Sequence, residues 1–187
     1  CMEDASVAVA YARQLARPNS GRVERMTRIY NYPAQSRIKS EDDKKELGVK
    51  TYFCSDVCAL YRKSYYEQVG GFVQPTIFNE DMIFASHLIE EGKKIAYVAD
   101  AKVWHWHNYT AKEQLKRNFD LAVSQADHPE VFGGIRSESE GIRLVKQTAH
   151  YLSEQHKPWL IPGMFVKSGF KYMGYRMGKA YHMLPQW

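Results

Sequence analysis

The order of the hydrophobic patterns is the feature that most limits how this chain can fold. In the first 110 residues, short apolar runs alternate with segments of helical periodicity. Beyond residue 110 only helical patterns follow. Strands that alternate with helices are typical of α/β layers. We therefore expect an α/β part followed by a helical part.

Turn and capping residues set the expected elements within this order. Strands are predicted at 7–12 and 51–63, and the segment 94–110 is predicted as a strand, a turn and a second strand. Helices are predicted at 23–30, 64–72, 80–91, 111–126, 138–155 and 158–182. Gly70, Gly71 and Gly92 are expected to end two of these helices, and Thr110 is expected to cap another.

Composition excludes several classes of protein. At 44% hydrophobic and 13% aromatic residues, the 187-residue chain can build a packed core and is not disordered. A net charge of +5 permits phosphate, anionic lipid or nucleic acid. The basic residues are spread out without a nucleic-acid fold signature, which argues against nucleic acid. Three cysteines form no disulfide framework and fit a reducing compartment. No apolar run reaches the roughly 18 residues that span a bilayer.

Two adjacent acids, Glu80 and Asp81, stand between Asn79 and an apolar run. In one interpretation they only begin a helix that Asn79 caps, where the helix dipole favours acids by about 0.3–1 kcal/mol. In the other, one acid is a general base, which must be held beside a pocket and ionised near neutral pH. The dipole is expected to keep Asp81 charged, so the two interpretations are compatible.

The stretch "VWHWHNY" at 103–109 is a second candidate. In a strand, His105 and His107 would share one face about 7 Å apart, where they could bind a metal or flank a phosphate. The alternative is a pair of satisfied polar residues at a strand end. Cys54 and Cys58 are also predicted to share a strand face, which makes a Cys/Cys/His/His zinc site conceivable. The cysteine spacing is not that of the usual zinc knuckle.

Gln114 and Arg117 lie three residues apart in "EQLKRNF" and therefore on one face of the predicted helix. They are candidates for a phosphate or sugar clamp. The alternative is a solvated basic face.

Several blocks together resemble the second half of family 2 glycosyltransferases, most strongly the bacterial rhamnosyltransferase-like group. The blocks cover roughly residues 5–135 and include "TYFCSDVCALYRKSYYEQVGGF", "TIFNEDMIFASHLIEEGKKIAYVADAKVWHWHNYT" and "FDLAVSQADHPEVF". The helical tail "FKYMGYRMGKAYHMLP" is also similar to that group.

The resemblance implies a GT-A fold and an inverting transfer of a sugar, rhamnose in that group, from a nucleotide-diphospho-sugar to a hydroxyl in polysaccharide biosynthesis. It assigns Asp81 as the base and Glu80 as its neighbour. Substrate binding would fall to Ser55, Asn79, Gln114 and Arg117. His107, and secondarily His105, would complete a site for divalent Mg or Mn. Asn118 departs from the family's Gln-x-x-Arg-Trp block, because it stands where the family has Trp.

A larger departure concerns the donor side. The family's first half holds a β-α-β nucleotide-binding unit and an Asp-x-Asp metal motif, and neither is present in this sequence. The resemblance therefore implies the C-terminal half of a partial GT-A domain at residues 1–135, inactive alone, followed by a helical tail at residues 136–187. The alternative is a non-catalytic module that binds an acceptor or a partner chain, and an oligomer is left open.

Residues 163–184 mix Met, Phe and Tyr with Lys167, Lys171, Arg176 and Lys179. Such a run suits an interfacial helix on anionic lipid. It would place a cytoplasmic enzyme at the inner face of the bacterial plasma membrane, near a saccharide or lipid-linked acceptor. The alternative is a helix that packs on its own domain, which Gly169, Gly174 and Gly178 favour because they weaken a free helix.

Overall fold

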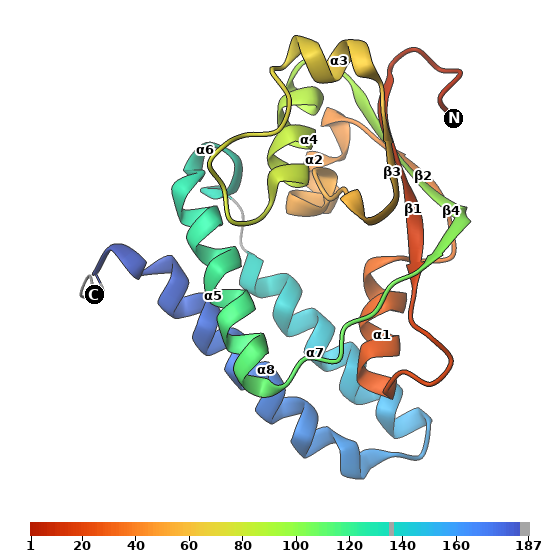
Figure 1. Ribbon diagram of the computed structural model, residues 1–187. Coiled ribbons are helices and arrows are strands. Elements are labelled where there is room, and N and C mark those ends of the chain that lie inside the picture. The colour runs from red at the N-terminus through yellow and green to blue at the C-terminus, as the bar shows by residue number, and fades with distance from the viewer. Residues whose placement is uncertain (135–136, 184–187) are drawn as a thin grey trace. The chain divides into compact units, whose positions relative to one another are not determined.

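A computed structural model describes residues 1–134 and 137–183 of the chain (Figure 1). The chain divides into two compact units, one of residues 1–18 and 28–106 and the other of residues 19–27 and 107–187. All described strands lie in the first unit, so the α/β expectation is confirmed. The predicted domain boundary after residue 135 lies outside the described residues, as does the last residue of the tail segment 163–184.

A four-stranded mixed sheet forms the centre of the first unit. Its strands are ordered β2-β4-β1-β3, with β1 parallel to β4 and the other two pairings antiparallel. Strand β1 is central and begins with a fully buried run of apolar and small residues, as expected for a strand covered on both faces. The strand bounds are Val7–Leu15 (β1), Arg37–Lys39 (β2), Ala59–Tyr61 (β3) and Lys94–Trp104 (β4).

Strand β4 is one continuous strand, so the predicted strand, turn and second strand at 94–110 are wrong. Its pairing with β1 jumps from Ala12 opposite Val98 to Arg13 opposite Lys102. The intervening residues 99–101 form a bulge, which bends a strand without ending it. Pairing resumes and ends with Leu15 opposite Trp104. The small and polar residues "ADA" at this bulge are residue types that bulges and turns share, so the pattern did not distinguish the two.

The segment 51–63 was predicted as a strand, and only residues 59–61 form one. Tight 3-10 turns precede it at Gly48–Thr51 and Asp56–Cys58. The buried ammonium of Lys39 donates to the carbonyl of Lys50 at 3.1 Å and to that of Phe53, which keeps these carbonyls out of a β ladder. As a result, Cys54 is buried and Cys58 is exposed, and the two do not share a strand face.

Helix α4 supplies much of the apolar cover of the sheet unit. Ile83, Phe84, Leu88 and Ile89 of this helix are all buried. The helices of this part are α1 (Arg22–Asn31, shared between the units), α2 (Lys44–Leu47), α3 (Lys63–Gln68) and α4 (Glu80–Glu90). The predicted glycine stops are confirmed, because Gly70 and Gly71 follow α3 and Gly92 follows α4 with positive φ angles.

The second unit is built from α5 (Ala111–Asp127), α6 (Pro129–Phe132), α7 (Ser137–Glu154) and α8 (Ile161–Lys179). Thr110 caps α5 as predicted, since its hydroxyl accepts from the Glu113 N–H and the Glu113 carboxylate accepts from the Thr110 N–H. Helices α5 and α8 lie side by side (Figure 1).

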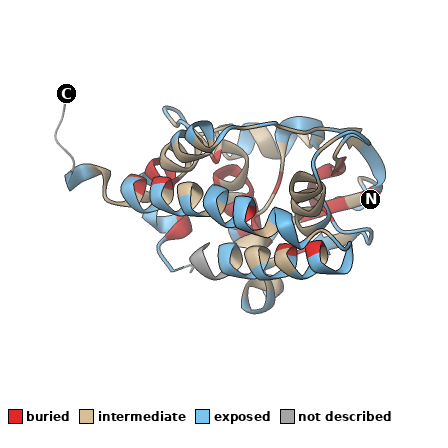
Figure 2. Cartoon of the chain, turned by 90° about the horizontal axis from the view of Figure 1, so that it is seen from below, coloured by how far each residue is buried: buried red, intermediate tan, exposed pale blue. Residues whose placement is uncertain are grey.

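Two glycines let α8 touch the backbone of α5. A Cβ atom on Gly174 would lie 2.2 Å from the Leu115 carbonyl oxygen, and one on Gly178 would lie 2.3 Å from that of Phe119. The predicted packing of the tail on its own domain is therefore confirmed for these two glycines. Figure 2 shows that α8 also keeps an extensive exposed side. Among the described residues, none of the helices combines the length and apolarity required to cross a membrane.

Candidate active site

Asp81 lies in the first turn of α4, after Asn79 and Glu80, as the sequence predicted. Asn79 is 8% exposed and occupies the N-cap position, but its side chain makes no capping hydrogen bond. An N-cap residue normally has an extended backbone. Asn79 instead has φ 67° and ψ 14°, in the left-handed region that Asn tolerates. The predicted position of the cap is confirmed and the predicted capping contact is wrong.

The carboxylate of Asp81 is held by main-chain donors. It accepts hydrogen bonds from the N–H of Met82, at 2.8 Å, and from the N–H of Asp56. Burial, followed by repulsion from the Asp56 carboxylate, raises the pKa of Asp81 to about 7, and Glu80 acts in the same direction. The helix dipole, which was expected to keep Asp81 charged, is therefore outweighed by burial and by the neighbouring carboxylates.

The helix dipole is a smaller effect than the burial of the carboxylate. The dipole contributes about 0.3–1 kcal/mol at exposed sites and up to about 2 kcal/mol at partly buried ones, whereas a pKa raised from 3.8 to about 7 reflects a larger cost of burying the charge. A carboxyl group that titrates near 7 is a better proton acceptor than an ordinary aspartate and is still ionised in about half the molecules at neutral pH. Asp81 thus meets the electrostatic requirement of a general base.

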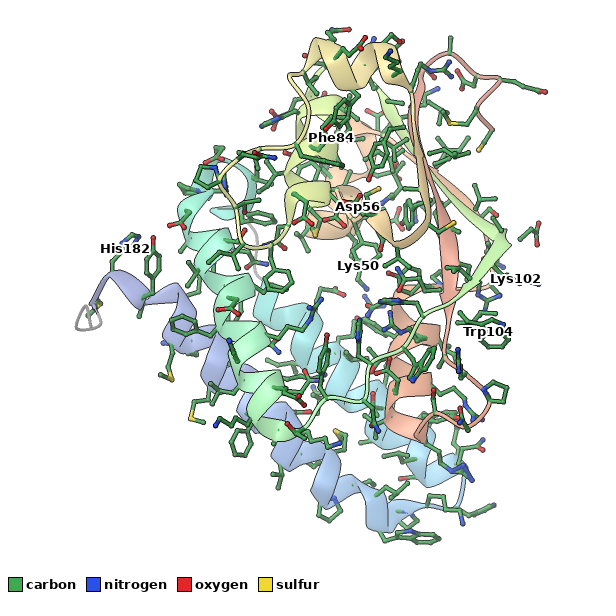
Figure 3. All side chains as sticks on the ribbon, viewed as in Figure 1. Lys50, Asp56, Phe84, Lys102, Trp104 and His182 are labelled. Carbon is green, nitrogen blue, oxygen red and sulfur yellow. The ribbon has the colours of Figure 1, made fainter. Side chains whose placement is uncertain are left out.

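Asp56, which the sequence pattern does not single out, lies in the turn before β3 and is labelled in Figure 3. Its main-chain N–H and its carboxylate both act on Asp81. The hydroxyl of Tyr61 in β3 donates to the Oδ1 atom of Asp56. Burial raises the pKa of Asp56, the Tyr61 hydrogen bond opposes this, and Glu80 adds a smaller increase. No local pattern in "CSDVC" marks this aspartate, because its partners come from β3 and α4.

Ser55, predicted to bind substrate, lies directly before Asp56 and is held from the sheet. Its hydroxyl accepts a 2.6 Å hydrogen bond from Nε2 of Gln14, which is 1% exposed in β1. The Gln14 side-chain oxygen in turn accepts from Arg28 at 2.6 Å. The structure therefore brings Ser55, Glu80 and Asp81 to one region of the first unit, together with Asp56.

The two histidines do not share a strand face, because β4 ends at Trp104. The main-chain N–H of His105 donates to the carbonyl of Leu15 at 3.0 Å, which adds one contact beyond the strand. The ring of His107 stacks on that of Tyr109 with 4.7 Å between ring centres. The prediction that strand geometry pairs the imidazoles is wrong for this physical reason.

Gln114 and Arg117 lie in α5 of the second unit. Asn118, at the position where the resembled family has Trp, donates from its amide to the main-chain carbonyl of Gln114 at 2.7 Å. The guanidinium of Arg117 lies 5.6 Å from the centre of the Tyr109 ring. Tyr109 therefore contacts both Arg117 and His107. The sequence did not mark Tyr109 because one tyrosine among 13 carries no signal.

A divalent ion in a protein is held by several oxygen, nitrogen or sulfur ligands at once. Within residues 1–134 and 137–183, no group of three or more His, Cys, Asp or Glu side chains is placed to hold a metal ion. The described side chains thus do not form such a site by themselves, and the roles of His105 and His107 at a metal stay predictions.

Comparisons with known proteins were made for the whole chain. No family model matches it, and no solved structure matches it. The chain is 40% identical over 185 residues to the O-antigen chain rhamnosyltransferase WbaN of Salmonella anatum and 38% identical over 185 residues to the O-antigen chain rhamnosyltransferase RfbN of Salmonella typhimurium. The aligned region is 97% of this chain and 58% of each relative, so the chain spans less than two thirds of their length. Over nearly all of its own length, this chain is similar to proteins named O-antigen chain rhamnosyltransferases.

Proposed function

We propose that the protein carrying this chain is a family 2 glycosyltransferase of GT-A fold that acts in O-antigen synthesis. It transfers a sugar, which we assign as rhamnose, from a nucleotide-diphospho-sugar to a hydroxyl of a saccharide acceptor. One observation carries this proposal beyond the similarity to rhamnosyltransferases. Asp81, at the start of a helix, has a pKa raised to about 7 and is therefore poised to exchange a proton at neutral pH.

In the proposed reaction, a carboxylate oxygen of Asp81 accepts the proton of the acceptor hydroxyl while the hydroxyl oxygen attacks the anomeric carbon. A new carbon–oxygen bond forms as the bond to the diphosphate breaks, and the diphosphate leaves with the electron pair from the opposite face. The configuration at the anomeric carbon is inverted. We assign Asn79, next to Asp81 in the first unit, to a sugar hydroxyl. Gln114 and Arg117 of the second unit stay candidates for a phosphate or sugar clamp, because a guanidinium matches phosphate oxygens.

A divalent Mg or Mn ion, if bound through His107 or His105 and other ligands, would supply charge to stabilise the departing diphosphate. The described residues do not form a three-ligand group, and no step proposed here passes through a metal. The chain also contains no Asp-x-Asp motif. That observation favours the second candidate function, a module that binds the acceptor or a partner chain without catalysis.

A pH–rate profile separates the two candidates. With a nucleotide-diphospho-rhamnose donor and an O-antigen saccharide acceptor, we expect transfer with inversion. The rate should rise with pH through a limb near pH 7, since Asp81 must be ionised to accept a proton. Transfer that is independent of pH between about 5 and about 9 would contradict a base of this kind. Acceptor binding without turnover would identify the binding module.

We further propose that α8 docks on the cytoplasmic face of the plasma membrane. Phe165, Val166, Tyr172, Met173 and Met177 are exposed on this helix. Residues 158–179 contain no acid, whereas Lys167 and Arg176 are exposed beside the apolar residues. Apolar and aromatic side chains flanked by cations suit an anionic lipid surface. Lys171 was predicted to take part, but it is half-buried near Glu24, and burial lowers its pKa.

Vesicle sedimentation tests this surface. The protein should pellet with phosphatidylglycerol vesicles at low salt, bind phosphatidylcholine vesicles weakly, and lose binding as salt rises. Replacing both Phe165 and Met173 with Ser should lower vesicle binding at least about tenfold, since both apolar contacts are lost. Ile142→Ser, at an exposed apolar position of α7, is the matched control and should bind normally. Absence of binding to anionic vesicles at low salt would remove the membrane from the proposal.

A further inference from the structure

The turn that carries Asp56 is anchored on several sides. Ser55 is hydrogen-bonded to the buried Gln14 of β1, and the thiol of buried Cys54 lies 4.0 Å from the hydroxyl of Tyr61. That hydroxyl donates to the Asp56 carboxylate. The main-chain N–H of Asp56 reaches across to the carboxylate of Asp81. The turn therefore presents two groups to Asp81, one donor and one negative charge.

We propose that Asp56 is a positioning residue for Asp81, whose carboxylate it orients through the main-chain N–H and makes a stronger proton acceptor through its own charge. This inference rests on the proposed role of Asp81 as the general base. It adds a residue 25 positions away in the chain whose part in the reaction neither the sequence pattern nor the similarity to rhamnosyltransferases assigns.

The energetic argument concerns the change of charge during the reaction. Before proton transfer, Asp56 and Asp81 are two like charges in a partly buried site, which raises the free energy of the ionised pair. When Asp81 accepts the hydroxyl proton, one of these charges disappears and the repulsion is relieved. An interaction that improves as the reaction proceeds lowers the barrier, whereas one that is equal before and after does not.

The negative charges that repel the Asp81 carboxylate come from Asp56 and Glu80, and the neighbouring thiol and hydroxyl groups add none. Glu80 lies at the start of the same helix and contributes a smaller repulsion. Burial raises the pKa of Cys54 and of Tyr32 to about 12, and those of Tyr11 and Tyr61 are also raised, so these groups are protonated at neutral pH. Asp81 adds to each of these increases, which shows that thiol and hydroxyls surround it without supplying a compensating charge.

The hydrogen bond from Tyr61 favours the ionised form of Asp56 and opposes the rise in pKa that burial causes. A hydroxyl that donates to a carboxylate stabilises its ionised form. Asp81 receives main-chain hydrogen bonds, but their effect is outweighed by burial and by Asp56. Two carboxylates in unequal surroundings take different proton affinities, a recurring arrangement in sites that move protons.

The test compares Asp56→Asn with the unchanged protein that carries this chain. Loss of the charge should move the acid limb of the pH–rate profile to lower pH by about one pH unit. The plateau rate should fall about three- to tenfold, because a base of lower pKa is weaker. Asp56→Glu should restore part of both properties. Asp100→Asn, at an exposed aspartate in the β4 bulge, should change neither.

A second measurement does not depend on turnover. Carbon-13 NMR of the aspartate carboxyl groups follows the titration of Asp81, whose resonance is identified by its loss in Asp81→Asn. The pKa of the Asp81 carboxyl group should also fall by about one unit in Asp56→Asn. An Asp81 titration that is unchanged in a folded Asp56→Asn variant would overturn the inference. A lowered pKa of Asp81 with an unchanged pH–rate profile would confirm the interaction between Asp56 and Asp81 but would show that Asp81 is not the general base.

Discussion

Replacing Asp81 with Asn in the protein that carries this chain should lower the rate of sugar transfer at least about a hundredfold, the usual scale for losing a general base. The amide of Asn has nearly the shape of the carboxylate, but it cannot accept the proton of the acceptor hydroxyl. Donor binding should survive, because the proposed donor contacts lie on other residues. The measurement is kcat with saturating donor and acceptor, together with calorimetric donor binding.

Two controls make this result interpretable. Asp100→Asn carries the same chemical change at an exposed position and should retain full activity. The Asp81→Asn protein should also be more stable than the unchanged protein at about pH 8. Between about pH 4 and 7 the folded protein holds a proton on Asp81 that the unfolded chain has released, so stability falls as pH rises through this window. The gain in unfolding free energy should be about 1–3 kcal/mol at pH 8 and should shrink towards pH 4.

Activity within a few-fold of normal would show that Asp81 is only an acid at a helix start. Loss of activity accompanied by lower stability at every pH would show that the variant is misfolded and that the carboxylate is needed for structure. Loss of activity with the stability gain at high pH is the pattern that only a buried, functional carboxylate explains.

Adding one methyl group to α8 should have opposite effects at two of its glycines. Gly174→Ala should lower the free energy of unfolding of the helical unit by about 2–4 kcal/mol, because its Cβ atom would lie 2.2 Å from the Leu115 carbonyl oxygen. That oxygen belongs to the backbone of α5 and cannot turn away as a side chain can. The helices must separate, which exposes apolar surface along their contact.

Gly169→Ala is the matched control, since a Cβ atom there meets nothing within 4 Å. Alanine favours a helix over glycine by about 1 kcal/mol, so this variant should be more stable than the unchanged protein. Urea denaturation followed by circular dichroism measures both effects. If both variants gained stability, the close contact between α5 and α8 would be refuted.

The features that the sequence predicted correctly depend on interactions between residues close together in the chain. The Thr110 cap and its Glu113 partner are three residues apart and form a local capping box. Gly92 takes the positive φ that glycine favours after a helix, and the acids Glu80 and Asp81 do begin α4. The order of an α/β part followed by helices also follows from the periodicity of the hydrophobic residues.

The features that the sequence predicted wrongly depend on partners far along the chain. The strand predicted at 51–63 forms only at 59–61, and ahead of it the carbonyls of Lys50 and Phe53 accept hydrogen bonds from the buried side chain of Lys39 instead of from a neighbouring strand. The bulge at 99–101 is defined only by the pairing of β4 with β1. The residue propensities within 51–63 and 94–110 carry no information about Lys39 or about strand β1. They therefore could not predict the shortened strand or the bulge.

The candidate site divides in the same way. By itself, the sequence determined that Glu80 and Asp81 stand at a helix start and that the chain has an α/β character. Only the tertiary structure decided the electrostatics, because the pKa of Asp81 depends on burial and on Asp56, which lies on a turn supported by β1 and β3. A helix dipole is a local property, whereas desolvation and the repulsion between carboxylates distant in sequence arise only when the chain has folded.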